Sequence, residues 1–257
     1  RLAQPQAMNC LKANMRAVWL EPAASEVNLL EATATSPPSV EQRLIATIVE
    51  FADGRPLMEW PFALLRRIGQ AVIDGESHIT TGPSGKEWYL DDPDARNKFR
   101  QPYRDFPASL AQSFAQLHAN ARGKSQRWLN PRGIKRTMDE LRNFLDEEWP
   151  AMELRSQFAR ATWTALGLSG EPQFDRLVAI PAWRIMLDAE GAAIYARAIV
   201  HKQTRVVQRS DLIQLVYLGV SGLRILATAD GPFLSMATQI VNGRYVGARV
   251  VHINSLL

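Results

Sequence analysis

Cysteine is nearly absent from this sequence of 257 residues, in which Cys10 is the only one. An internal disulfide is therefore excluded, and so is a zinc site made of several thiolates. This cysteine usage fits a reducing compartment, and we expect a cytoplasmic protein. Long apolar runs are lacking too, because the longest candidate, 212–227, is interrupted by Gln214 and Arg224. A membrane span needs about 18 apolar residues, so we expect no membrane partner.

The motifs of several common sites are also missing. No G-x-G-x-x-G occurs, so a dinucleotide fold has no support. The run 82–86 resembles a phosphate-binding loop, but Thr80 replaces its first glycine and Glu87 replaces its Ser or Thr. The run 219–222 lacks the spacing of a nucleophile elbow, and the four histidines are too scattered for a typical zinc site. Acidic side chains that offer oxygen ligands remain as the main chemical candidates.

The composition is that of a globular protein, with 46% hydrophobic and 22% charged residues. Its net charge of +4 is unevenly spread. Eleven lysines and arginines occur in 96–142, against three acids, so the rest of the chain is net negative. Basic residues pair with phosphates and aromatic residues stack on bases, which makes a polyanion a suitable partner. An ordinary solvated surface with core aromatics remains the alternative. Aromatic residues interleaved with these charges include Phe99, Tyr103, Phe106 and Trp128.

Hydrophobic periodicity predicts a small parallel sheet with strands near both chain ends. The expected strands are 16–20, 223–230 and 248–253. A large helical block lies between them, and we expect 53–190 to be an insertion or cap. A polar, Gly- and Pro-rich loop is predicted at 74–107. The expected helices begin near Ser25 and Ser39 and then occupy 61–73, 108–118, 131–144, 153–166, 174–187, 192–200, 209–218 and 232–241.

Three acids occupy places where α/β proteins build their sites. Asp211 lies in the first turn of the helix 209–218, Asp230 ends the strand that follows it, and Glu31 lies on the helix that begins near Ser25. Strand ends and the helix starts beside them meet at one edge of a parallel sheet. Each acid also has an ordinary interpretation. Asp211 is suited to a helix start, Asp230 to a turn and Glu31 to a solvated helix face.

The C-terminal run from Asp211 to Leu218, followed by Ile225 to Asp230 with its Thr-x-Asp, resembles the end of a PIN-like nuclease domain. The run 25–31 resembles the N-terminal part of that family. The resemblance implies one α/β domain over 1–257 with a central parallel sheet flanked by helices. It implies that Glu31, Asp211 and Asp230 bind Mg²⁺ or Mn²⁺ and that Thr228 supports the site. The implied reaction is hydrolysis of phosphodiester bonds in RNA or single-stranded DNA.

Such a reaction is chemically consistent with the sequence. Hard oxygen ligands hold Mg²⁺, which keeps several waters and contacts the substrate phosphate. The metal generates the attacking hydroxide, so no serine or cysteine nucleophile is needed. A toxin-like or defence effector would be an enzyme of this kind. The residues expected to contact nucleic acid are Arg122, Lys124, Arg127, Arg132, Lys135, Arg136, Arg205 and Arg209.

One departure from the family keeps other interpretations open. The family begins with a strand that ends in an Asp, and 1–3 resembles the sequence just after that Asp. Either the start of the chain is missing here, which leaves catalysis in place, or the first acid has been lost. Loss of that acid favours a non-catalytic nucleic-acid-binding or assembly subunit, with a protein partner or a homo-oligomer. A third interpretation is a helical interaction protein in which every acid is structural. Asp188 and Glu190 lie near an expected turn between helices, from which they could approach the site, but they are not among its predicted residues.

Overall fold

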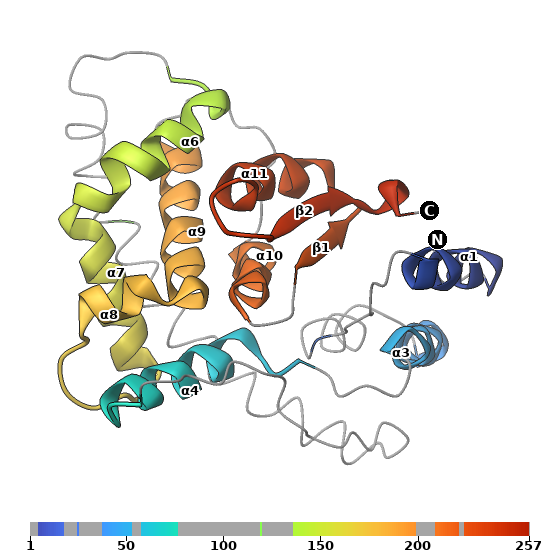
Figure 1. Ribbon diagram of the computed structural model, residues 1–257, viewed down its shortest axis with the longest axis horizontal. Coiled ribbons are helices and arrows are strands. Elements are labelled where there is room, and N and C mark those ends of the chain that lie inside the picture. Colours follow the sequence, from blue (N-terminus) through green and yellow to red (C-terminus); the bar gives the residue numbers. More distant parts are fainter. Residues whose placement is uncertain are drawn as a thin grey trace. The chain divides into compact units, whose positions relative to one another are not determined.

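The computed structural model describes residues 5–17, 25, 38–52, 58–76, 119, 136–198, 209–220 and 224–256 (Figure 1). The chain forms two compact units. The first unit consists of Arg1–Trp60, Gly82–Phe106 and Ile253–Leu257, and the second of Pro61–Thr81 and Pro107–His252. Both units draw on distant parts of the chain, and the parallel strands lie in the second.

The first unit contains two amphipathic helices, α1 (Pro5–Ala17) and α3 (Pro38–Ala52). Leu11 and Met15 of α1 are buried one helical turn apart, and Ile45 of α3 is buried as well. A parallel β-bridge joins Ser25 to Met58. The short 3-10 helix η5 (Ile253–Ser255) ends the described part of this unit. Its neighbour Leu256 accepts a 3.2 Å hydrogen bond on its carbonyl oxygen from the side chain of Asn14.

The second unit is mostly helical and is organised around α9 (Pro181–Ala198). This helix is buried on nearly every side, because other elements pack against both its flanks (Figure 1). The helical elements before α9 are α4 (Pro61–Ile73), η1 (Met138–Glu140), α6 (Leu141–Asn143), the π-helical turn η2 (Phe144–Glu148), η3 (Trp149–Ala151), α7 (Glu153–Ala165) and α8 (Phe174–Ala179). Those after it are α10 (Arg209–Ile213), the 3-10 helix η4 (Gln214–Gly219) and α11 (Gly231–Val241).

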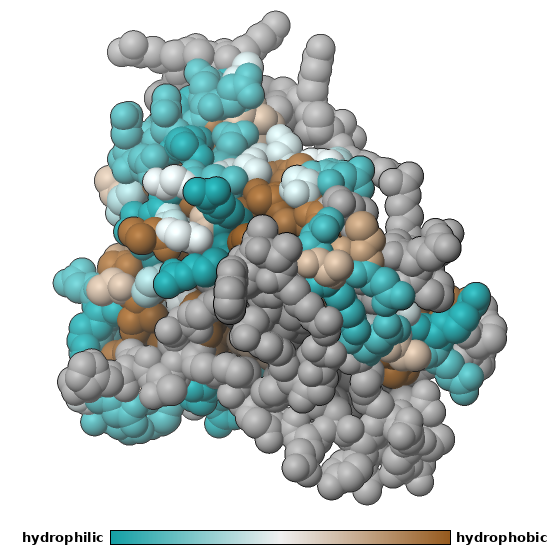
Figure 2. Space-filling model, turned by 45° about the vertical axis from the view of Figure 1, so that its right-hand side comes forward, coloured by the Kyte–Doolittle hydropathy of each residue, from teal (hydrophilic) through white to brown (hydrophobic). Residues whose placement is uncertain are grey.

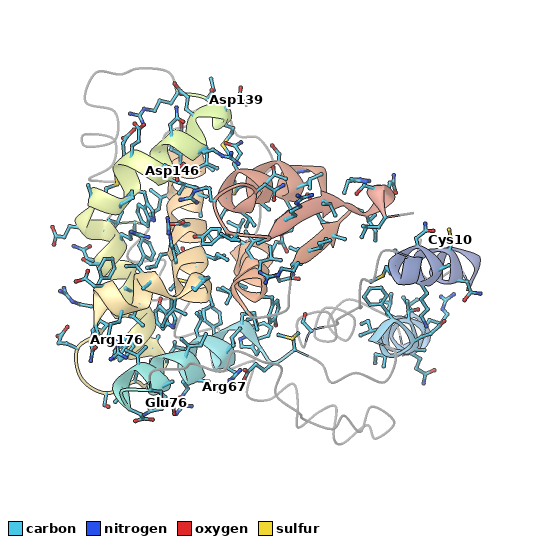
Figure 3. The ribbon with its side chains drawn as sticks, viewed as in Figure 1. Cys10, Arg67, Glu76, Asp139, Asp146 and Arg176 are labelled. Carbon is cyan, nitrogen blue, oxygen red and sulfur yellow. The ribbon has the colours of Figure 1, made fainter. Side chains whose placement is uncertain are left out.

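Large aromatic side chains fill the core between α9 and its neighbours. Phe144 lies against Trp149 and Tyr195, and Trp163 lies against Trp183, each as a tilted ring pair. Such rings bury large apolar areas and hold the helices at fixed separations. Outside this core, Arg176 of α8 donates a 3.2 Å hydrogen bond to the carbonyl oxygen of Val72 in α4 (Figure 3).

The C-terminal part of the second unit is a β–α–β unit. Strands β1 (Ile225–Thr228) and β2 (Arg249–His252) pair in parallel, with Ile225 opposite Arg249 and Thr228 opposite His252. Parallel neighbours need a crossover, and α11 supplies it. α11 packs on both strands and on α9. The carboxyl ends of both strands therefore lie at the same edge of the sheet.

Most of the predicted elements that lie in the described ranges are confirmed. The helices at 39–52, 61–73, 153–165 and 232–241 and the two C-terminal parallel strands are present, and the described residues are mostly helical with a small parallel sheet. The apolar run 209–218 is helical throughout, but it changes from α10 to the tighter η4. The predicted helix 108–118 and the loop at 77–107 lie outside the described residues.

Two predictions are wrong. Arg16 and Ala17 belong to helix α1, because the buried pair Leu11 and Met15 continues a helical rather than an extended pattern. The expected break near Gly191 does not exist, since α9 continues through it. That glycine is explained by packing, because a Cβ there would lie 2.7 Å from ring atoms of Trp149.

On the face shown in Figure 2, hydrophilic side chains cover much of the coloured surface, with smaller hydrophobic areas between them. No helix within the described ranges combines the length and the apolar composition needed to cross a membrane.

Candidate functional site

The end of β1 places a threonine and an aspartate side by side. Asp230 is the N-cap of α11, and its Oδ1 accepts a 2.8 Å hydrogen bond from the backbone N–H of Phe233. Its own N–H donates a 3.1 Å hydrogen bond to Oγ1 of Thr228. The sequence Thr-x-Asp-Gly-Pro folds this way because aspartate is a favoured N-cap and proline suits the first helical turn. The Asp230 side chain is exposed and held in one orientation.

Asp211, the second predicted acid, lies in the first turn of α10 and is half-buried. Its carboxylate is favoured there by the backbone N–H groups that a helix start leaves without intrahelical partners. α10 packs against both α9 and α11. Asp211 and Asp230 therefore belong to two helices that contact each other within the same unit.

The two aspartates offer oxygen ligands, but they do not form a complete metal site by themselves. Within the described residues, no group of three or more His, Cys, Asp or Glu side chains is arranged to hold a metal ion. Glu31, the third predicted ligand, lies outside the described residues. Of the two oxygens of Asp230, Oδ1 serves the cap, and Oδ2 has no hydrogen bond with any described residue. Thus Oδ2 is the oxygen best suited to a hard cation.

Most of the residues predicted to contact nucleic acid lie outside the described part of the chain. Arg136 is half-buried, and its Nη1 lies 2.6 Å from Oε1 of Glu148. Hydrogen bonding to this carboxylate raises the pKa of Arg136. The guanidinium is therefore already engaged within the protein. The side chain of Arg209, at the start of α10, is not described. Outside the described residues lie Arg122, Lys124, Arg127, Arg132, Lys135 and Arg205.

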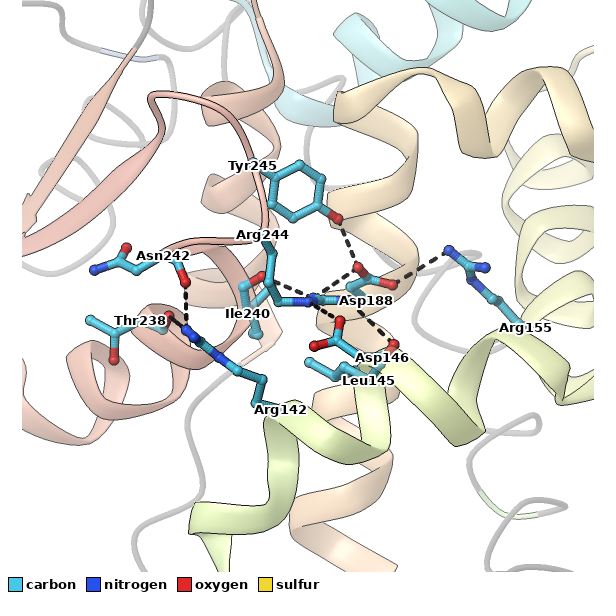
Figure 4. A network of polar contacts seen from close by, with 10 residues as sticks. All are labelled: Arg142, Leu145, Asp146, Arg155, Asp188, Thr238, Ile240, Asn242, Arg244 and Tyr245. Atoms are coloured by element: carbon cyan, nitrogen blue, oxygen red, sulfur yellow. Dashed lines mark hydrogen bonds and ion pairs between the residues drawn. The ribbon is translucent and has the colours of Figure 1, made fainter.

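A buried ionic network, which the sequence did not predict, lies between α9 and the turn that joins α11 to β2 (Figure 4). Asp188 of α9 is only 1% exposed. Its Oδ2 accepts a 2.7 Å hydrogen bond from the hydroxyl of Tyr245 and lies 3.0 Å from Nη1 of Arg244. Its Oδ1 lies 3.5 Å from Nη2 of Arg155 on α7. Asp188 thus connects three elements that are far apart in the sequence.

Arg244 extends this network to the end of α11. It donates hydrogen bonds to the carbonyl oxygens of Ile240 and Leu145 and to the carboxylate of Asp146, which lies on η2. Burial raises the pKa of Asp188, while the nearby Arg244 and the Tyr245 hydrogen bond oppose that rise. Burial also raises the pKa of Tyr245, so this hydroxyl remains a hydrogen-bond donor at neutral pH. The network fixes the α11–β2 turn against α9, with Asp188 buried at its centre and Asp146 at its exposed edge.

The sequence contains a signal at the position of this network, but that signal favoured a break in the helix rather than a buried pair of acids. Asp188 and Glu190 are two acids in an otherwise apolar stretch that ends near Gly191. This arrangement favoured a helix break, whereas the structure buries both acids inside α9. A buried acid needs partners, and the arginines that provide them lie 33 residues before and 56 residues after Asp188 along the chain.

Comparison with known proteins adds no family to these observations. No protein-family model matches the sequence, no curated protein matches it, and no solved structure matches it.

Proposed function

We propose that this protein is a metal-dependent nuclease of the PIN-like kind, which hydrolyses phosphodiester bonds of RNA or single-stranded DNA. The observation that carries the proposal is the β1–α11–β2 unit with Thr228 and Asp230 at the carboxyl end of β1. Asp211 comes from α10, which packs against α11. Both acids therefore lie at helix starts of one α/β unit, which is where such folds place their sites.

In this proposal Asp211 and Asp230 contribute oxygen ligands to Mg²⁺ or Mn²⁺. Glu31, the third acid predicted from the sequence, lies outside the described residues. Capping of α11 orients the carboxylate of Asp230, so that Oδ1 faces the helix and Oδ2 is available to the cation. Thr228 Oγ1 accepts a hydrogen bond from the Asp230 N–H and holds the backbone that carries the ligand. The ion would activate a water molecule and neutralise the charge that develops on the phosphate oxygens.

The decisive experiment compares cleavage of RNA and single-stranded DNA with Mn²⁺ by the wild type, Asp211→Asn and Asp230→Asn. Asparagine is also a good N-cap, so Asp230→Asn keeps the α11 cap while it removes the ligand charge. Asp175→Asn is the matched control, because Asp175 is an exposed acid in the first turn of α8. We expect strong loss of cleavage in the first two variants and wild-type activity in the control. Equal activity in all four proteins would refute the proposal.

The cap also supports a second candidate function. Asp230 already has a structural role as the N-cap of α11. That role fits a non-catalytic nucleic-acid-binding subunit on the same kind of fold. This alternative predicts that the wild type binds single-stranded nucleic acid but does not cleave it with Mg²⁺ or Mn²⁺. It also predicts that Asp211→Asn leaves that binding unchanged.

A further inference from the structure

Three arginines gather around the turn between α11 and β2, at the amino ends of the two strands. Arg224 Nη1 donates a 3.2 Å hydrogen bond to the carbonyl oxygen of Val246 in this turn. The guanidinium carbon of Arg184 lies 5.5 Å from the ring centroid of Tyr245. Arg249 follows the turn, and its N–H donates a 2.7 Å hydrogen bond to the carbonyl oxygen of Arg224. We call Arg184, Arg224 and Arg249 the arginine surface.

The arginine surface is exposed and carries uncompensated charge. All three side chains are exposed, and none forms an ion pair with a carboxylate of the described residues. Other arginines of the same unit behave differently. Arg136 pairs with Glu148, and the exposed Arg160 lies 3.4 Å from the carboxylate of Glu171. The two acids that contact the turn through Arg244 are the buried Asp188 and the exposed Asp146, and both are paired with Arg244.

The turn between α11 and β2 allows a ligand to come close to its backbone. Gly243 and Gly247 both have positive φ, 78° and 73°, and both are exposed. Because glycine has no side chain, a ligand can reach the backbone at these two positions. Val246 between them is 96% exposed. The buried network of Asp188 with Arg244 and Tyr245 holds the turn from beneath (Figure 4). A rigid turn keeps the charges in a fixed arrangement, which lowers the entropic cost of binding.

We propose that the arginine surface binds the sugar-phosphate backbone of a single-stranded nucleic acid. Guanidinium groups bind phosphates through paired N–H donors, and the glycines let the strand approach the turn. The exposed Val246 offers an apolar contact to a sugar or base. This surface differs from the basic stretch 96–142 that the sequence pointed to, and it involves none of the residues expected there.

The location of this surface extends the proposed nuclease function, on which the inference rests. Arg224 precedes β1 and Thr228 ends it, so the arginine surface and Asp230 lie at opposite ends of one strand. Four strand residues span about 13 Å, which a few nucleotides of a bound strand can bridge. The arginines would thus bind the nucleic acid a few nucleotides from the phosphate that is cleaved.

The test measures the binding of a fluorescently labelled single-stranded oligonucleotide by anisotropy, in a chelator so that no metal-dependent cleavage occurs. Arg184→Gln/Arg249→Gln removes two charges, while the control Arg66→Gln/Arg160→Gln removes two from exposed sites elsewhere in the unit. We expect the first pair to weaken binding roughly tenfold. Each lost phosphate contact lowers the slope of log affinity against log salt by about 0.7, so this pair should lower it by about 1.4.

Arg184→Lys/Arg249→Lys shows whether weaker binding comes from lost charge or from a disturbed fold. It keeps both charges, so it should retain the wild-type dependence of affinity on salt. Equal weakening by the two glutamine pairs, or an unchanged slope in Arg184→Gln/Arg249→Gln, would overturn the inference. Binding of the wild type to phosphatidylserine vesicles without binding to the oligonucleotide would overturn it as well. Failure of the nuclease proposal would be seen in a different experiment. In that case the protein would not cleave nucleic acid with Mn²⁺ but would still bind the oligonucleotide in the chelator.

Discussion

Removal of the Asp188 carboxylate should destabilise the second unit more than removal of an ordinary surface acid. Asp188 is 1% exposed, and the side chains of its partners Arg244 and Arg155 are 6% and 9% exposed. Asp188→Ala leaves Arg244 with Asp146 as its one remaining acid among the described residues, and it removes the only carboxylate that pairs there with Arg155. Breaking a buried ion pair by removal of one partner costs about 3–5 kcal/mol. We expect a loss of that size in the free energy of unfolding.

Tyr245→Phe provides a graded comparison at the same site. It keeps the ring that Arg184 and Arg244 lie against, and it removes only the hydroxyl that donates the 2.7 Å hydrogen bond to Asp188. A hydrogen bond to a charged group contributes about 1.5–3 kcal/mol. The expected loss is therefore smaller than that of Asp188→Ala. The exposed Asp175→Ala should change stability by less than about 0.5 kcal/mol.

Urea unfolding at neutral pH and low salt measures all three variants, because urea does not screen ion pairs. In this range of chain lengths, 1 kcal/mol shifts the melting temperature by about 2–4 °C, so Asp188→Ala should also lower it by roughly 10 °C. If Asp188→Ala unfolds at the same urea concentration as Asp175→Ala, the network does not hold the turn against α9. The reasoning would then be wrong.

Further predictions test other contacts of the fold. Gly191→Ala should destabilise the protein by about 1–3 kcal/mol in urea unfolding, because its Cβ would press against the buried ring of Trp149, whereas Gly231→Ala, with open space around it, should not. Burial raises the pKa of Tyr195 from 10.0 to about 12, so the unfolded state loses this proton first. Stability should therefore fall between about pH 10 and 12 in the wild type more than in Tyr195→Phe; parallel pH profiles would contradict this. Mn²⁺ should raise the melting temperature of the wild type but not of Asp230→Asn, and an equal rise in both would exclude Asp230 as a ligand.

Elements with a complete local pattern were predictable from the sequence, and elements that depend on distant partners were not. The strand β1, the N-cap Asp230 and helix α11 follow from a short apolar run and a Thr-x-Asp-Gly-Pro sequence, and all three are present. The continuity of α9 through Gly191 was missed because the reason for a glycine there is the ring of Trp149, which lies 42 residues earlier. The local sequence around Gly191 does not show that the ring of Trp149 fills the space which a side chain at this position would need.

The candidate site shows the same division. The positions of Thr228 and Asp230 were predicted because both follow directly from the end of one strand. The roles of Asp188 and Arg244 were missed because a buried charge in a helix has no distinguishing sequence signal until its partner is known. The basic stretch 96–142 is recognisable by its density of charge, whereas the arginine surface combines single arginines from α9, from the residue before β1 and from β2.

Helix α11 connects the two functional proposals physically. Its N-terminus is capped by Asp230, while the carbonyl oxygens near its C-terminus accept hydrogen bonds from Arg142 and Arg244 (Figure 4). Negative charge at the start of a helix and positive charge at its end both complement the helix dipole. The same contacts fix the carboxylate at one end of the sheet and the turn with its arginines at the other. A strand of nucleic acid that touches both ends would therefore meet two sites held at a constant separation by one short helix.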